Sequence, residues 1–176
     1  MSNPTAWDVI QKQLDAMPKP QQVLRLCSDP ELRDRYHQAK LAKERAEEYL
    51  KSVEKDADKE AVAAVRRQVR DAKTAFERAC EAYEAATVVL TFQALERGQL
   101  EDLIKQHPPT EEEEAEGDEF HAETFAPALI AASSVDGMPL EYAQHAMRTW
   151  ALDDWKSLWG AAWSVQQRKR SDLGKG

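Results

Sequence analysis

The sequence contains few of the residues that build tight turns: of its 176 residues, only 6 are glycine and 8 are proline. A sandwich or barrel of many short strands needs more turn-forming residues than this. No apolar run approaches the roughly 18 residues of a membrane-spanning helix. The first residues also lack the basic and then apolar pattern of a secretion signal. We therefore expect an intracellular chain with no membrane partner.

Cysteine is scarce as well, since Cys27 and Cys80 are the only two and lie far apart in the chain. Neither they nor the 4 histidines follow a metal-ligand spacing. The chain also lacks a glycine-rich phosphate loop. Ser133, Asp136 and His145 are the residue types of a hydrolase triad, but the glycine-flanked turn that exposes a nucleophilic serine is missing. We expect no metal, no cofactor and no catalytic site, and hence a protein that is not an enzyme.

Positive charge is limited to short clusters, of which residues 168–170 (Arg-Lys-Arg) are the clearest. A nucleic-acid-binding protein needs a basic stripe that displaces counterions, so we expect no nucleic-acid partner. Most of the formal net charge of −8 comes from residues 111–123, which hold eight acidic residues and no basic one. Such a stretch repels itself and offers little to bury. It predicts a flexible acidic linker over residues 111–124.

Helical periodicity is what the sequence has in abundance. Ser28-Asp29-Pro30-Glu31 is typical of a helix start. From there, apolar residues recur in alternating steps of four and three, with Lys43 as the one polar member and a polar break at residues 54–60. The recurring positions are Leu32, Tyr36, Ala39, Lys43, Ala46, Leu50, Val53, Val62, Val65, Val69, Ala72, Phe76, Ala79, Tyr83 and Ala86. This spacing predicts an antiparallel coiled-coil hairpin over about residues 30–86, with assembly between chains as the alternative.

The segments that flank the hairpin, residues 22–27 and 87–95, are rich in β-branched and other apolar residues. They predict two antiparallel strands at the base of the hairpin, within an N-terminal module of residues 1–110. Because two strands alone are marginally stable in water, a helix must cover one face. The candidates are a helix around residues 97–107 and an N-terminal helix with Trp7, Ile10 and Leu14.

Residues 125–168 predict a C-terminal module of three helices, and residues 169–176 predict a disordered tail. The expected fold class is therefore mainly α. Four of the 5 tryptophans fall in the C-terminal module. The simplest interpretation is that they form its core, but so small a module cannot bury four large rings completely. Part of the row is then a candidate partner-binding surface, made of Trp150, Trp155, Trp159, Trp163 and Phe125.

Several segments also occur in an order that resembles a known family. The N-terminal half has Val23-Leu-Arg-Leu-Cys27, Asp29-Pro-Glu-Leu32, Leu90-Thr-Phe-Gln-Ala-Leu95 and His107-Pro-Pro-Thr110. The C-terminal half has Phe125-Ala-Pro-Ala-Leu-Ile-Ala-Ala-Ser133, Leu140-Glu-x-Ala143 and Trp155-x-x-Leu-x-x-Ala-Ala-Trp-x-Val165. The chain resembles the tail assembly chaperones of long-tailed bacteriophages, in the form found in phages of actinobacteria. One departure is Gln166, where the family pattern leads us to expect Asn.

The resemblance implies a non-enzymatic assembly factor in the cytoplasm of the infected bacterium. Such chaperones coat the helical tape-measure protein, keep it soluble, help to recruit tail-tube subunits, and are absent from the mature virion. The alternative is a coiled-coil structural or adaptor subunit that stays in a finished viral assembly. In this family a ribosomal frameshift often adds a longer form. Gly174-Lys175-Gly176 can be encoded by a slippery run of bases, although a plain Gly/Lys-rich end is the simpler interpretation.

Overall fold

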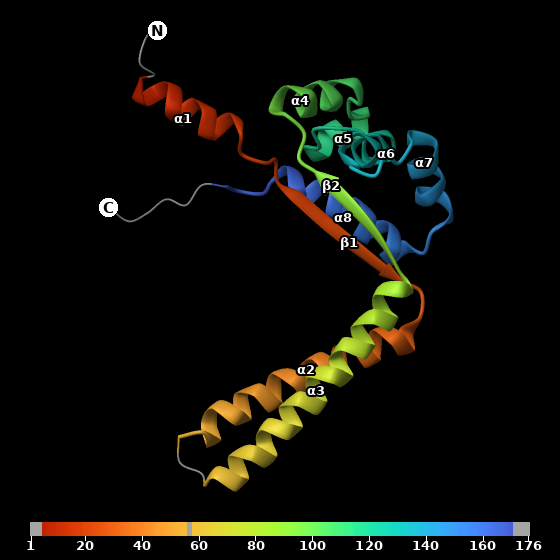
Figure 1. The fold of residues 1–176 in the computed structure, drawn as a ribbon. Helices are drawn as coiled ribbons and strands as arrows, with labels where there is room; N and C mark the ends of the chain where they lie inside the picture. The colour runs from red at the N-terminus through yellow and green to blue at the C-terminus, as the bar shows by residue number, and fades with distance from the viewer. Residues whose placement is uncertain (1–4, 56–57, 171–176) are drawn as a thin grey trace. The chain divides into compact units, whose positions relative to one another are not determined.

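The computed structural model describes residues 5–55 and 58–170 (Figure 1). Within these residues there are eight helices and two strands, so the fold is mainly α, as predicted. None of the described helices is both long enough and apolar enough to cross a bilayer. In chain order the elements are α1 (Ala6–Asp15), β1 (Gln21–Cys27), α2 (Pro30–Val53), α3 (Lys59–Ala85), β2 (Thr87–Gln93), α4 (Arg97–Gln106), α5 (Glu111–Glu116), α6 (Ala122–Ser133), α7 (Leu140–Thr149) and α8 (Leu152–Gln166).

The chain divides into two compact units. One unit is Arg25–Val89, which contains the hairpin of α2 and α3. The other combines the described parts of Met1–Leu24 and Leu90–Gly176, with α1 and α4–α8. All 5 tryptophans belong to this second unit, so their fluorescence reports on it alone.

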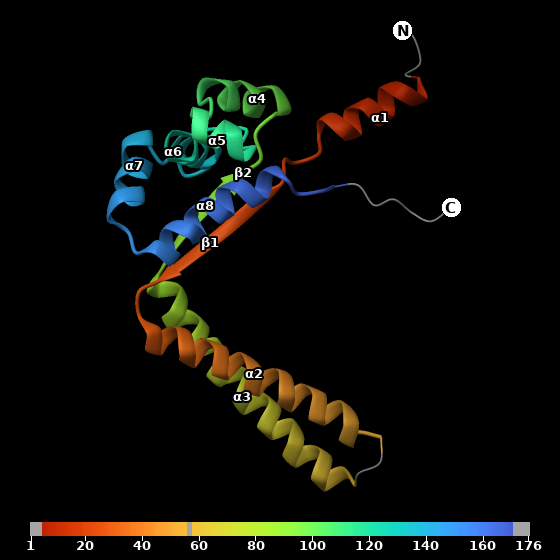
Figure 2. The ribbon, with the colours of Figure 1, turned by 180° about the vertical axis from the view of Figure 1, so that it is seen from behind.

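The hairpin helices begin where the sequence places their caps. The Asp29 carboxylate accepts hydrogen bonds from the backbone N–H groups of Glu31 (2.9 Å) and Leu32 (3.2 Å), with Pro30 in the first turn. The Asp58 carboxylate accepts one from the N–H of Ala61 (2.7 Å). These contacts satisfy donors that have no partner inside the helix. The two helices then pack side by side, as both ribbon views show (Figures 1 and 2).

Every position of the predicted seam is buried or half-buried in the hairpin. Val65 and Val69 are the most buried, at 8% and 6% exposure. Towards the other end, the Tyr36 ring stacks on Tyr83 with centroids 4.7 Å apart. The polar seam residue, Lys43, places its amine 4.7 Å from the centroid of the Phe76 ring. This cation–π contact explains how a lysine is accommodated at a seam position.

Removing the cap of α2 should weaken the hairpin. Asp29→Ala deletes the acceptor for two N–H groups and is expected to cost about 1 kcal/mol of unfolding free energy. The measurement is urea unfolding followed by helical circular dichroism. Asp34→Ala, an exposed position in the same helix with no cap role, serves as the control. Equal stability of the two variants would contradict the assigned cap.

The predicted strands pair as a two-stranded antiparallel sheet, β1 with β2. The other edge of β2 is partly occupied by the turn after α6. Phe92 forms an antiparallel bridge with Ser134, and the Val135 N–H donates to the Thr91 carbonyl (2.8 Å). The Asp136 carboxylate accepts from the Thr91 N–H (2.7 Å). The C-terminal helices are therefore joined to the sheet through its backbone.

The same helices cover one face of the sheet. Phe92 is fully buried in a core that it shares with residues of α6, α7 and α8, against which Leu24, Leu90 and Ala94 also pack. This arrangement differs from the expected cover, because Trp7, Ile10 and Leu14 of α1 remain exposed. It also differs from the expected division into modules at residues 1–110 and 125–168, since β2 and α6–α8 share one core. Helices α6–α8 together bury more apolar surface against the two strands than the single helix α1 could, and a two-stranded sheet depends on such packing for its stability.

The structure also differs from the flexible linker expected at residues 111–124. Residues Glu111–Glu116 form α5, which is capped reciprocally by Thr110 and Glu113 and ends at Gly117 in the left-handed conformation (φ 93°). Acidic side chains in a first helical turn are stabilised by the partial positive charge of the helix N-terminus. The acidic run therefore favours a short capped helix here. In the expected tail, Lys169 and Arg170 follow α8 with no regular structure, whereas residues 171–176, including Gly174-Lys175-Gly176, lie outside the described residues.

Candidate functional site

The predicted contact residues are less exposed than a free binding surface requires. Trp150, Trp155, Trp159 and Trp163 are all half-buried, and Phe125 is fully buried. Phe125 is therefore a core residue, because α6 packs between α7 and α8 and places its apolar side chains inside. The structure removes Phe125 from the candidate surface.

The four tryptophans divide between two places. Trp150 and Trp155 pack against the core that contains Phe92 and Leu158. The Trp159 and Trp163 rings stack on each other, with centroids 5.4 Å apart and an interplanar angle of 17°. Phe120 meets Trp163 edge-on at 5.5 Å. Aromatic pairs of this kind add about 0.5–1.5 kcal/mol beyond their burial. The half-buried rings of Trp159 and Trp163, which are not part of the Phe92 core, remain a candidate surface beside those of Trp150 and Trp155.

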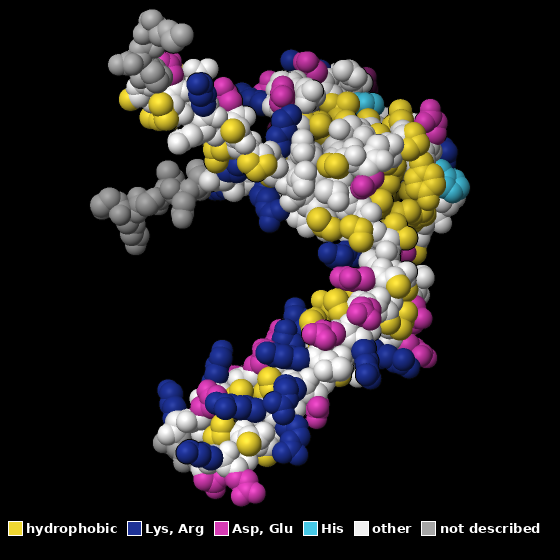
Figure 3. Space-filling view, viewed as in Figure 1, with side chains coloured by type: hydrophobic (Ala, Val, Ile, Leu, Met, Phe, Trp, Pro, Cys, Tyr) yellow, Lys and Arg dark blue, Asp and Glu magenta, His cyan; other side chains and the backbone are white. Residues whose placement is uncertain are grey.

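The groove bounded by α4, α6 and α7 is a second candidate surface, and the sequence did not indicate it. Its volume is about 890 Å³. Small side chains of α6 form part of its lining, and Leu103 of α4 and Leu140 of α7 add larger apolar groups. The lining residues are Leu103, Gln106, His107, Pro108, His121, Thr124, Ala128, Ala131, Ala132, Leu140 and Gln144. In the space-filling view, hydrophobic side chains gather over α6 and α7 (Figure 3). We call this feature the α6 groove.

A third surface is the apolar face of α1, which was one of the two candidate covers for the sheet. Trp7, Ile10 and Leu14 follow one another at helical spacing and are 61%, 47% and 52% exposed. Met17, just beyond the helix, is 47% exposed. No residue of α1 is buried. Hydrophobic side chains along α1 are visible in Figure 3. The helical period was readable in the sequence, but the absence of a partner for this face within residues 5–55 and 58–170 was not.

Next to the α6 groove, a hydrogen-bonded pair connects α5 to the N-terminal end of α6. The Nδ1 atom of His121 lies 2.8 Å from one Glu113 carboxylate oxygen and 3.0 Å from the other. The Thr110 N–H donates to the same carboxylate (2.8 Å). The pKa of Glu113 is lowered, chiefly by the Thr110 N–H. Burial opposes this effect, and the hydrogen bond with His121 lowers the pKa further. Glu113 therefore anchors α5 as a carboxylate.

This pair makes a pH-dependent prediction. Because the folded pKa of Glu113 lies below its ordinary value of 4.5, its contribution to stability is present above that value and is lost as pH falls through the lowered pKa. In His121→Ala, a nuclear magnetic resonance titration of the Glu113 carboxyl should show its pKa rising part of the way towards 4.5, since the Thr110 N–H remains. His145→Ala is the matched control. A Glu113 titration that is identical in both variants would contradict the assigned pair.

Two of the three residues that could suggest a hydrolase triad, Ser133 and Asp136, make structural hydrogen bonds instead. The buried Ser133 hydroxyl donates to the Leu129 carbonyl (2.7 Å), and the Asp136 carboxylate accepts from the Thr91 N–H. Cys27 and Cys80 are free thiols. Burial, and then the neighbouring Glu84, raises the pKa of Cys80. Across residues 5–55 and 58–170, no group of three or more His, Cys, Asp or Glu side chains is arranged to hold a metal ion.

Comparison of the chain with models of protein families, with curated proteins and with solved structures finds no match.

Proposed function

We propose that the protein is a tail assembly chaperone of a long-tailed bacteriophage. It binds the helical tape-measure protein, keeps it soluble in the host cytoplasm, and helps to bring tail-tube subunits to it. The observation that carries the proposal is the α6 groove, an open apolar surface between helices. An amphipathic helix places its apolar face in such a groove. The sequence resemblance supplies the identity of the helical partner.

The lining of the groove suits a partner that is held for a limited time. Ala128, Ala131 and Ala132 allow a helix backbone to approach α6 closely, while Gln106 and Gln144 can pair with polar groups of the partner. Many copies, each with a weak contact, can coat a long helix and still be displaced one at a time. The acidic residues of α5 are exposed apart from Glu113, and their charge would keep the coated complexes apart in solution.

Co-expression with the tape-measure protein tests the proposal. The wild-type chain should move the tape-measure protein from the insoluble to the soluble fraction. Ala132→Arg places a long charged side chain in the groove at an exposed helix position, and should abolish this rescue while preserving helical circular dichroism. Ala122→Arg, at an exposed position of α6 outside the groove lining, is the matched control and should rescue fully.

Trp163→Ala separates the groove from the predicted tryptophan surface. Retained rescue by Trp163→Ala together with loss in Ala132→Arg supports the groove. The opposite pattern would move the contact to the rings of Trp159 and Trp163. Failure of the wild-type chain to keep the tape-measure protein soluble would reject the chaperone function itself.

A further inference from the structure

The apolar face of α1 lacks a partner among the described residues of its own unit. Trp7, Ile10 and Leu14 form one stripe, and Met17 extends it beyond the helix end. A helix of 10 residues has little stability in water without packing, even with the Thr5–Asp8 capping box that begins this one. An exposed tryptophan in such a stripe is the type of residue that dominates binding energy at protein interfaces. The helix therefore has the properties of a docking segment.

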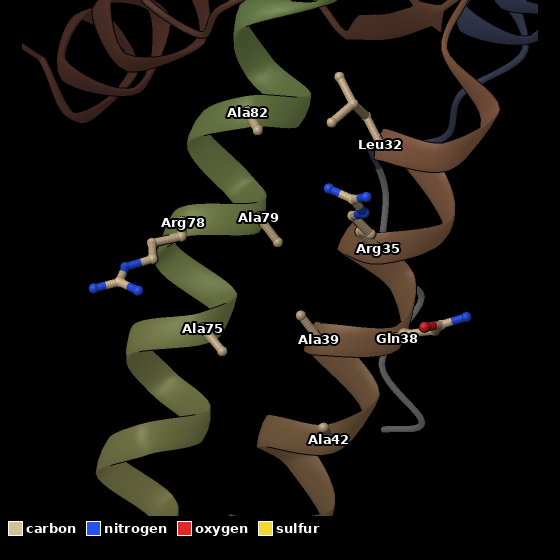
Figure 4. Close-up of a pocket in the computed structure, with 9 residues that line it drawn as sticks. All are labelled: Leu32, Arg35, Gln38, Ala39, Ala42, Ala75, Arg78, Ala79 and Ala82. Atoms are coloured by element: carbon tan, nitrogen blue, oxygen red, sulfur yellow. The ribbon is translucent and has the colours of Figure 1, made fainter.

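The hairpin has an open groove whose length and lining suit α1. Between α2 and α3 lies an open groove of about 560 Å³. Figure 4 shows the small side chains that leave it open: Ala39 and Ala42 on α2, and Ala75, Ala79 and Ala82 on α3. Leu32 lies at one end, and Arg35 extends from α2 towards the space between the helices, whereas the Arg78 side chain points away from it (Figure 4).

The helix and the groove match in length and in surface. The groove runs along α2 from Leu32 to Ala42, about the span of the 10 residues of α1. A lining of alanines admits the larger Trp7, Ile10 and Leu14 side chains. The Asp8 carboxylate is held by the Thr5 cap. In a helix with 100° per residue, Asp15 lies on one flank of the stripe, so the groove's Arg35 can pair with it.

The α6 groove is a poorer site for α1. The α6 groove is bordered by the acidic helix α5, and its lining residue His121 is already paired with the Glu113 carboxylate. The carboxylates of α5 and those of Asp8 and Asp15 on α1 would repel each other. In the hairpin groove, Arg35 has only a long, exposed pair with Glu31 (3.8 Å), which is weak and can be exchanged. Charge complementarity therefore favours the hairpin groove over the α6 groove.

We propose that α1 of one copy docks in the α2–α3 groove of a second copy. This inference goes beyond the chaperone function and concerns the purified chain alone. Helix and groove are different surfaces, so the contact is head-to-tail. Such contacts close into rings or continue as filaments, because each added copy presents a new helix and a new groove.

The first test is sedimentation velocity of the full chain over a concentration series. The wild type should form oligomers larger than a dimer. Trp7→Ala should weaken self-association at least about thirtyfold, as expected for a central aromatic anchor. Val9→Ala changes an exposed apolar residue on the other side of α1 and should leave association unchanged. In the groove, Ala75→Arg should block association, whereas Ala64→Arg, at an exposed position of α3 outside the groove, should not.

Mixing two blocked variants gives the decisive result. A Trp7→Ala chain keeps an intact groove, and an Ala75→Arg chain keeps an intact α1. Each alone should be monomeric with wild-type helical circular dichroism, and their mixture should stop at a one-to-one dimer. A monomeric wild type, which is also the result of docking within one chain, overturns the proposal. So does a mixture that stays monomeric, or association that survives both substitutions.

Discussion

Phe92→Ala is expected to lower the free energy of unfolding of the tryptophan-containing unit by about 3–5 kcal/mol. The Phe92 ring is fully buried and is the β2 side chain at the centre of the core shared with α6, α7 and α8. Its loss leaves a cavity between the sheet and the helices that neither can close. The measurement is urea unfolding followed by tryptophan fluorescence, since all 5 tryptophans lie in this unit.

Val88→Ala is the matched control, because Val88 lies in the same strand and is 60% exposed. It should change stability by no more than about 0.5 kcal/mol. If Phe92→Ala were as mild as Val88→Ala, the helices would not depend on the strand for their packing.

The second large effect is expected in the hairpin. Phe76→Ala removes a ring that contacts Tyr36 (5.6 Å between centroids) and lies under the Lys43 amine. Because Phe76 is only half-buried, we expect a loss of about 2–3 kcal/mol, below that of a fully buried ring. Tryptophan is absent from this unit, so thermal melting is followed by helical circular dichroism.

Tyr49→Ala provides the comparison for Phe76→Ala. Tyr49 is an aromatic residue of α2 that is 56% exposed. The two variants should differ clearly in melting temperature. Equal melting temperatures would mean that the aromatic contacts of the seam do not stabilise the hairpin.

The hairpin was predictable because its signals are local. Asp29 and Pro30 mark a helix start in any context, and the alternating four- and three-residue steps define one face of each helix. A hairpin that folds back on itself then needs no further information. The strands that flank it were predictable for the same reason, from their β-branched residues and their positions beside the two helices.

The partners of the other apolar faces were not predictable from local pattern. Periodicity identifies Trp7, Ile10 and Leu14 as one face of a helix and Phe92 as a residue of a strand face, but it does not say which faces meet. The core around Phe92 depends on contacts between residues far apart in the chain. At α5, Thr110 and Glu113 form a recognisable capping box, but the run of eight acidic residues that includes Glu113 also predicts charge repulsion, and the two signals conflict.

Both the groove and the burial of Phe125 follow from the same non-local packing. The α6 groove is made by α4, α6 and α7 together, so the sequence of no single segment indicates it. Phe125 is an aromatic residue, a type that is common at binding surfaces, but it is buried where α6 packs against α7 and α8. Sequence pattern therefore located the apolar residues, and only the arrangement of helices separates core from surface among them.

As proposed, the protein assists tail assembly and then leaves. Quantitative mass spectrometry of infected cells tests it most directly, by comparing complexes that contain the tape-measure protein with purified finished particles. We expect this chain in the precursor complexes, in many copies per tape-measure protein, and we expect none in finished particles. A fixed ratio of this chain to the tail proteins in finished particles would rule out the proposed chaperone function and identify a structural subunit.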